Sequence, residues 1–304
     1  DTSSYVVISD IIIEGNNVTQ TSIILKELTF AQGDTINISD FANEMRLSRE
    51  NVQNTTLFNF VDFECISDEN FPANVQIKIK VTERWYLWVY PYVSYADRNL
   101  NVWYEADDLN RFSYGFDLEH RNFLGLKHSL KITCIAGYNQ NYGLSYDIPY
   151  LVDKYRFGLK AGFAYKRDKE VAYVTNDNKI SYFNGGEEFA KQTTNFFVEP
   201  YYRFGHRNKL FLNICYNDTY FHDTLLCLNP DFNGHFQYFS LMMTFKNDYR
   251  DEQNYPLNGH YLELLLEKTG LGFFDTSPDI FYGKITADWY QPIKGRWYWS
   301  SNLT

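Results

Sequence analysis

Residues 239–268, FSLMMTFKNDYRDEQNYPLNGHYLELLLEK, read as two strands joined by a polar turn. In both strands every second residue is apolar: Phe239, Leu241, Met243 and Phe245 in the first, and Leu262, Leu264 and Leu266 in the second. Neighbouring side chains on a strand point to opposite faces, so each strand has one apolar and one polar face. Pro256 and Gly259 suit the turn, because Pro fixes φ and Gly permits a positive φ. The stretch predicts an antiparallel hairpin.

The same alternation continues from Trp85 to the end of the chain and predicts eleven strands. A soluble antiparallel sandwich with one wet face would produce such a pattern. So would a transmembrane β-barrel, which has an apolar lipid face and a polar lumen. Three features favour the barrel: the strands are long for a sandwich, their polar faces carry charges of both signs, and aromatic residues lie near strand ends as in a membrane girdle. These aromatic residues are Trp85, Tyr95, Tyr138, Trp289 and Trp297.

The lengths of the connections agree with a barrel. If the N-terminus lies on the inner side, the outer connections are mostly long, as at 97–111 and 167–193, and the inner ones are shorter, as at 122–126 and 205–208. Bacterial barrels have this asymmetry. Within 167–193, the pieces VAYV and ISYF predict an additional hairpin. Bacterial single-chain barrels have even numbers of strands, and an open sheet of eleven strands would leave two unpaired edges in lipid. We therefore expect a sequence that lacks the C-terminal part of its barrel.

Residues 1–84 have a different pattern and predict a separate α+β domain with the element order β-α-α-β-β. The predicted strands are 6–14, 58–66 and 73–82, and the predicted helices are 19–28 and 39–54. Ser39 is the expected N-cap of the second helix, because a Ser side chain can accept a bond from a free amide of the first turn. Residues 85–304 form the second domain, the N-terminal part of the barrel.

Three stretches of the first domain resemble a POTRA domain, a periplasmic module that precedes outer-membrane barrels: EGN at 14–16, ELTFAQGD at 27–34 and NTTLFNFVDF at 54–63. The barrel part adds the string D-x-R-D-x4-P-x2-G, formed by Asp248, Arg250, Asp251, Pro256 and Gly259. It lies at an inner turn after the eighth barrel strand and resembles the BamA/TamA-type bacterial surface antigen family. The [VI]-R-G-[FY] motif of that family is absent. We expect Asp248 and Arg250 to point into the lumen, where a charge pair could tie neighbouring strands.

The resemblance implies an outer-membrane assembly factor with its N-terminal domain in the periplasm and about 11 of an expected 16 barrel strands. It would insert or translocate client proteins by strand templating. Its partners would be outer-membrane lipids and unfolded β-barrel clients, and accessory periplasmic lipoproteins remain open. The expected client-binding residues lie on two strands. They are Phe58, Phe60, Val61, Phe63 and Ile66 on the first, and Trp85, Leu87, Val89, Pro91 and Val93 on the second.

Other functions find little support in the sequence. The net charge of −10 without a basic block argues against nucleic-acid binding. The six His and four Cys are scattered, and neither a metal-ligand spacing nor a nucleophile or phosphate-binding motif occurs. We therefore expect neither an enzyme nor a cofactor. Two alternatives stay open: a passive outer-membrane pore or surface receptor, and a soluble β-rich binding protein.

Overall fold

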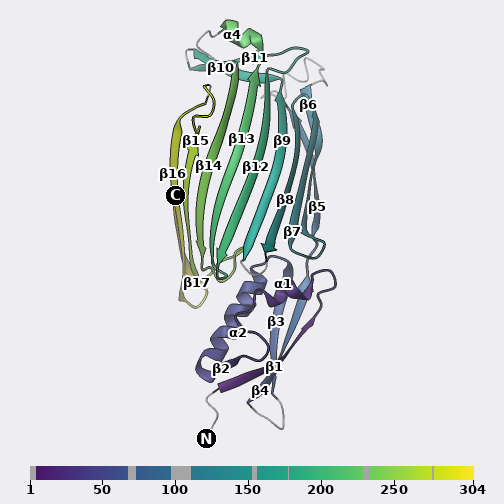
Figure 1. The fold of residues 1–304 in the computed structure, drawn as a ribbon, viewed down its shortest axis with the longest axis vertical. Helices are drawn as coiled ribbons and strands as arrows, with labels where there is room; N and C mark the ends of the chain where they lie inside the picture. Colours follow the sequence, from purple (N-terminus) through teal and green to yellow (C-terminus); the bar gives the residue numbers. More distant parts are fainter. Residues whose placement is uncertain are drawn as a thin grey trace.

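The computed structural model describes residues 5–67, 73–96, 111–152, 156–176, 178–228, 233–275 and 277–304. A small α+β domain lies at one end of a tall antiparallel sheet (Figure 1). The predicted fold class is confirmed, since the large sheet has eleven strands.

The small domain has six elements. They are β1 (Tyr5–Glu14), α1 (Thr21–Leu25), β2 (Thr35–Asn37), α2 (Ile38–Gln53), β3 (Phe58–Ser67) and β4 (Asn74–Glu83). The strands are ordered β2-β1-β4-β3, with β1 and β4 parallel and the other pairs antiparallel. Alternate residues of β4, including Ile77 and Ile79, are buried together with Ile23 and Ile24 of α1 and Val52 of α2. Strand β3 lies at one edge of the sheet, because it is last in this strand order.

Three details of the predicted domain were wrong. The short strand β2 was not expected, because three residues are too few to show a period. Helix α1 covers only part of 19–28. Helix α2 begins at Ile38 after Asn37, so Ser39 is inside the helix rather than its N-cap, and no side chain caps the helix. The antiparallel pairing of Asn37 with Tyr5 fixes the chain as a strand up to that residue.

The strands of the large sheet follow one another along the chain. They are β5 (Leu87–Tyr95), β6 (Phe112–Phe123), β7 (His128–Gly137), β8 (Gln140–Val152), β9 (Phe157–Asp168), β12 (Lys191–Phe204), β13 (Asn208–Phe221), β14 (His235–Asp248), β15 (Gly259–Thr269), β16 (Ile280–Lys294) and β17 (Trp297–Leu303). A predicted extra hairpin is present as β10 (Glu170–Asn176) and β11 (Lys179–Asn184). It lies with helix α4 (Asp223–Leu228) at the end far from the small domain (Figure 1).

The two faces of the large sheet differ as the alternation predicts. On β12, Phe196 and Val198 are about half exposed, whereas Tyr201 and Arg203 on the opposite face are each 7% exposed. Tyr138 was wrongly placed in the girdle: it is buried, and its hydroxyl donates to Glu170 of the outer hairpin. Nearly all of the predicted long connection 97–111 lies outside the described residues. Within the described residues, no helix is long and apolar enough to cross a membrane.

Candidate functional site

Among the described residues, strand β3 pairs with β4 alone, so the backbone groups of its other edge have no strand partner there. The predicted residues on this strand divide between two environments. Phe58 and Val61 are buried in the core of the small domain, and Phe63 is half-buried against it. Phe60 is 68% exposed and Ile66 is 47% exposed. Only Phe60 and Ile66 of the five therefore offer an accessible apolar surface beside the open edge.

Within the part of the chain that the structure describes, strand β5 forms one edge of the large sheet and pairs only with β6. Leu87, Val89 and Val93 are exposed on its outer face, and Trp85 is exposed just before the strand begins. Pro91 pairs with Phe116 of β6, and a proline without an amide hydrogen is tolerated best on an edge strand. The predicted client-binding residues are thus split between two separate sheet edges and do not form one site.

The Asp-Tyr-Arg-Asp motif builds the turn between β14 and β15. The Arg250 guanidinium donates two bonds to the Asp248 carboxylate, at 2.8 and 2.7 Å. This pair closes the turn on itself, so the expectation that it ties neighbouring strands was wrong; the link to β15 is instead the stacking of Arg250 on Tyr261. Gly259 has φ of +107°, and a Cβ there would lie 2.1 Å from the Tyr249 carbonyl oxygen.

Asp251 holds the turn through its side-chain carboxylate. Its Oδ1 accepts amide hydrogens from Glu252, Leu257 and Asn258 at 2.9–3.2 Å. Asn54, at the end of α2, donates to the Asp251 carbonyl at 3.1 Å and accepts from the Gln253 amide at 3.0 Å. The motif is therefore a docking point between the small domain and the large sheet, a role that its sequence did not reveal. Pro256 lies within this turn.

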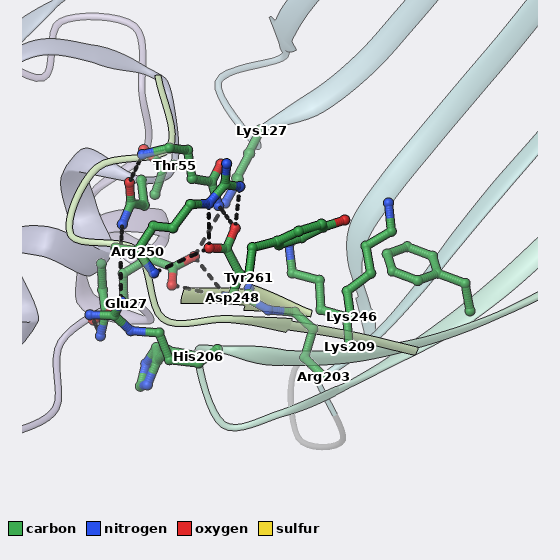
Figure 2. A pocket seen from close by; sticks show the side chains of 15 residues that line it. Glu27, Thr55, Lys127, Arg203, His206, Lys209, Lys246, Asp248, Arg250 and Tyr261 are labelled. Carbon is green, nitrogen blue, oxygen red and sulfur yellow. Dashed lines mark hydrogen bonds and ion pairs between the residues drawn. The ribbon is translucent and has the colours of Figure 1, made fainter. Parts of the chain in front are cut away.

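A buried ion-pair cluster between the domains is centred on Glu27, which was not among the predicted site residues (Figure 2). Its carboxylate accepts two bonds from Arg203 at the inner end of β12, at 2.9 and 3.2 Å. Lys127 of the β6–β7 turn lies 3.3 Å away, and the Tyr150 hydroxyl also donates to it. The side chains of Glu27 and Arg203 are only 3% and 8% exposed.

The cations beside Glu27 keep its carboxylate ionised. Burial by itself would raise the pKa of this carboxyl, but the Lys127 ammonium and the Arg203 guanidinium outweigh burial and hold the pKa well below its usual range. Glu27 is therefore ionised at any physiological pH. Its ELTFAQGD context was visible in the sequence, but nothing there shows which strand ends face it.

A second polar chain connects the domains near the start of β5. The fully buried Asn122 amide donates to the Thr19 hydroxyl at 2.9 Å, and Tyr86 lies 3.0 Å from the same hydroxyl while donating to the Leu57 carbonyl. Burial raises the pKa of Tyr86 to about 12, so its hydroxyl stays protonated and can donate. Glu83 accepts the Thr19 amide at 2.6 Å, which fixes the loop that carries Thr19.

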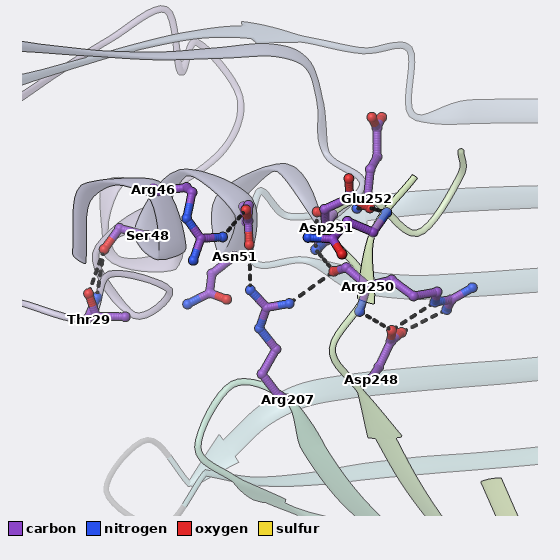
Figure 3. Close-up of polar contacts among 12 residues, drawn as sticks. Thr29, Arg46, Ser48, Asn51, Arg207, Asp248, Arg250, Asp251 and Glu252 are labelled. Carbon is purple, nitrogen blue, oxygen red and sulfur yellow. Dashed lines mark hydrogen bonds and ion pairs between the residues drawn. The ribbon is translucent and has the colours of Figure 1, made fainter. Parts of the chain in front are cut away.

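Two further contacts, at Gly125 and at Arg207, also connect the small domain to the large sheet. Gly125 has φ of +70°, its carbonyl accepts the Gln20 amide at 2.9 Å, and a Cβ there would lie 2.2 Å from the Val18 carbonyl oxygen. Arg207, in the β12–β13 turn, donates to Glu50 of α2 at 2.8 Å and to the Arg250 carbonyl at 2.9 Å (Figure 3). A cavity of about 280 Å³ remains between these contacts and the inner face of the sheet.

The ion pairs of this junction connect the small domain to the large sheet. Glu27, Glu50 and Asp248 are each ion-paired with an arginine of the protein, and Lys209 and His206 line the cavity beside them. Among the described residues, no group of three His, Cys, Asp or Glu side chains could hold a metal ion.

Comparison with known proteins agrees with this architecture. The sequence of residues 6–84 matches the POTRA family, described as the surface antigen variable number repeat. Residues 6–84 are a POTRA domain. The expected likeness to the BamA/TamA-type surface antigen family is thereby confirmed by sequence over residues 6–84.

The fold of the whole chain is similar to two solved barrel proteins. BamA from Haemophilus ducreyi lacking POTRA domains 1–3 is 17% identical, with a TM-score of 0.50 over 98% of this chain and 54% of that one. CdiB from Escherichia coli is 12% identical, with a TM-score of 0.51 over 98% of this chain and 53% of that one. The chain thus spans about half the length of each structure. No curated protein sequence matches it.

Proposed function

We propose that this POTRA–barrel protein is an outer-membrane assembly factor that inserts or translocates client polypeptides. Its POTRA domain would lie in the periplasm and the exposed apolar face of its large sheet would face lipid. The observation that carries the proposal is the open edge of β3, held against the base of the sheet by the buried Glu27–Arg203 pair.

A client segment in an extended conformation would add to β3 as a further strand. The free backbone groups of the edge supply affinity, and the exposed Phe60 and Ile66 supply apolar contacts for alternate client residues. The second open edge, β5, would then template client strands with Leu87, Val89 and Val93 at its lipid-facing side. Strand pairing and burial of the client in lipid supply the energy, so no nucleotide, cofactor or enzymatic step is needed.

Photo-crosslinking tests client capture on β3. A benzophenone amino acid at Phe60 or Ile66 is expected to crosslink an unfolded outer-membrane barrel, whereas the same group at Ile38, which is 55% exposed on α2, is the control. Equal labelling at all three positions would show that β3 has no special role.

A folding assay separates assembly from passive conduction. The purified protein in liposomes is expected to accelerate the folding of an added client barrel, and Phe60→Lys with Ile66→Lys is expected to reduce that acceleration. A charged side chain on an edge strand opposes further pairing. Conductance without any acceleration of client folding would instead favour a passive pore or receptor.

A further inference from the structure

A groove of about 420 Å³ lies beside the proposed capture edge. One side is formed by Arg49, Glu50 and Gln53 of α2, and the other by residues 59–62 of β3. Asp251 and Glu252 of the β14–β15 turn close it at the end nearest the large sheet. The groove is therefore complete only when the POTRA domain is docked.

Hydrogen bonds fix the position of the β14–β15 turn, which supplies Asp251 and Glu252 to the groove. Asn54 bonds to the backbone of Asp251 and Gln253, and the Asp251 carboxylate accepts three amides of its own turn. The Glu252 side chain extends away from this bonded cluster (Figure 3), and no bond or ion pair of its carboxylate is found within the described ranges. Glu252 thus presents an available charge at the end of the groove.

The charges in the groove do not cancel. Glu50 is paired with Arg46 at 2.6 Å and with Arg207 at 2.8 Å, so it is compensated. The remaining lining charges are the carboxylates of Asp62, Asp251 and Glu252 against the single guanidinium of Arg49. A strand that adds to β3 would therefore meet a negative wall at the end next to the large sheet.

We propose that this groove selects extended client segments that carry a Lys or Arg at the end lying against Asp62 and Glu252. The proposal rests on the proposed capture of clients by β3 and adds a specificity element to it. Backbone pairing with β3 is indifferent to sequence, the exposed Phe60 favours apolar residues at alternate positions, and the carboxylates favour a cation at one end.

Peptide binding to the whole protein in detergent micelles tests the proposal. Three labelled peptides share one alternating apolar and polar core and end in two Lys, two Gln or two Glu residues. Because exposed ion pairs are individually weak, we expect the Lys peptide to bind about three- to tenfold more tightly than the Glu peptide at low salt. The difference should shrink at about 0.5 M salt, where the charges are screened.

Charge reversals locate the preference. Glu252→Lys is expected to abolish it, while Glu187→Lys, the same change of charge in the exposed loop between β11 and β12, should leave it intact. Equal binding of the three peptides, or a preference that survives Glu252→Lys, would overturn the selectivity alone. If none of the peptides binds, or if Ile66→Lys leaves the binding of all three unchanged, capture on β3 fails as well.

Discussion

Replacing Glu27 by Gln should release the POTRA domain from the base of the sheet. The substitution keeps the shape of the side chain and an oxygen that can accept a bond from Tyr150. It removes the charge that faces Arg203, whose side chain is only 8% exposed and so cannot turn to solvent. Lys127 is 20% exposed and can find water. The cost therefore comes mainly from a guanidinium left buried without a counter-charge, about 3 kcal/mol.

Hydrogen exchange measures this cost directly. Every 1.4 kcal/mol corresponds to about a tenfold change in an opening equilibrium, so amide protection in residues 19–28 should fall by roughly 100-fold if local undocking exposes them. Their protection depends on the docked state, because the Gln20 amide donates to Gly125 across the junction. Glu64→Gln is the matched control: its pair with Lys80 is solvent-exposed on the same domain, and we expect no change.

A double substitution tests the reasoning behind the magnitude. Arg203→Gln alone leaves Glu27 without its main counter-charge, whereas Glu27→Gln with Arg203→Gln leaves neither charge buried alone. The double variant should therefore lose much less protection than the sum of the two single variants. Additive losses, or unchanged protection in Glu27→Gln, would refute the buried pair as the anchor of the junction.

The remaining predictions concern the same joint and its turns. Protection of residues 19–28 should stay constant from pH 7 to about 5 and fall below the ordinary carboxyl pKa of 4.5, because a depressed pKa in Glu27 supplies stability that is lost only as acid protonates it; loss already between pH 7 and 6 would contradict this. Asn122→Ala should weaken docking by about 1–3 kcal/mol, measured by the same exchange, since the buried Thr19 hydroxyl loses its amide donor and the Lys127 amide loses its acceptor. Gly125→Ala should undock the domain, while Gly186→Ala, with a similar positive φ but nothing within 4 Å, should not. Arg250→Glu should lower barrel assembly, seen as loss of heat-modifiability on gels; unchanged assembly would remove its architectural role.

The fold could be predicted because its two signals are local. Alternation along each strand, as in Leu262, Leu264 and Leu266, requires no knowledge of neighbours, and the counted strands pair in chain order. Strand β2 was missed because only its pairing with β1 makes it a strand. Tyr138 was misplaced because alternation assigns a face but does not reveal the hairpin that covers it.

The candidate site could be predicted only in part, for a related reason. The resemblance to POTRA domains implied that β3 is an open edge, but which of its residues are accessible depends on a register that places Val61 in the core and Phe60 outside. The junction could not be predicted from the sequence, because Glu27 and Arg203 are 176 residues apart. Their meeting depends on how the domain is set beneath the strand ends.

The position of the POTRA domain against the inner strand ends matters for the proposed function. β4, the partner of the capture edge β3, leads into β5 through only residues 84–86. A free hinge at residues 84–86 would let the two edges take many relative positions, and each client strand would pay that entropy on transfer. Three bonds join separate inner parts of the large sheet to the POTRA domain: Arg203 of β12 to Glu27, Asn122 of β6 to Thr19, and Asp251 of the β14–β15 turn to Asn54. The contacts therefore restrict the two edges to one arrangement before any client arrives, and this preorganisation favours templated pairing over chance encounter.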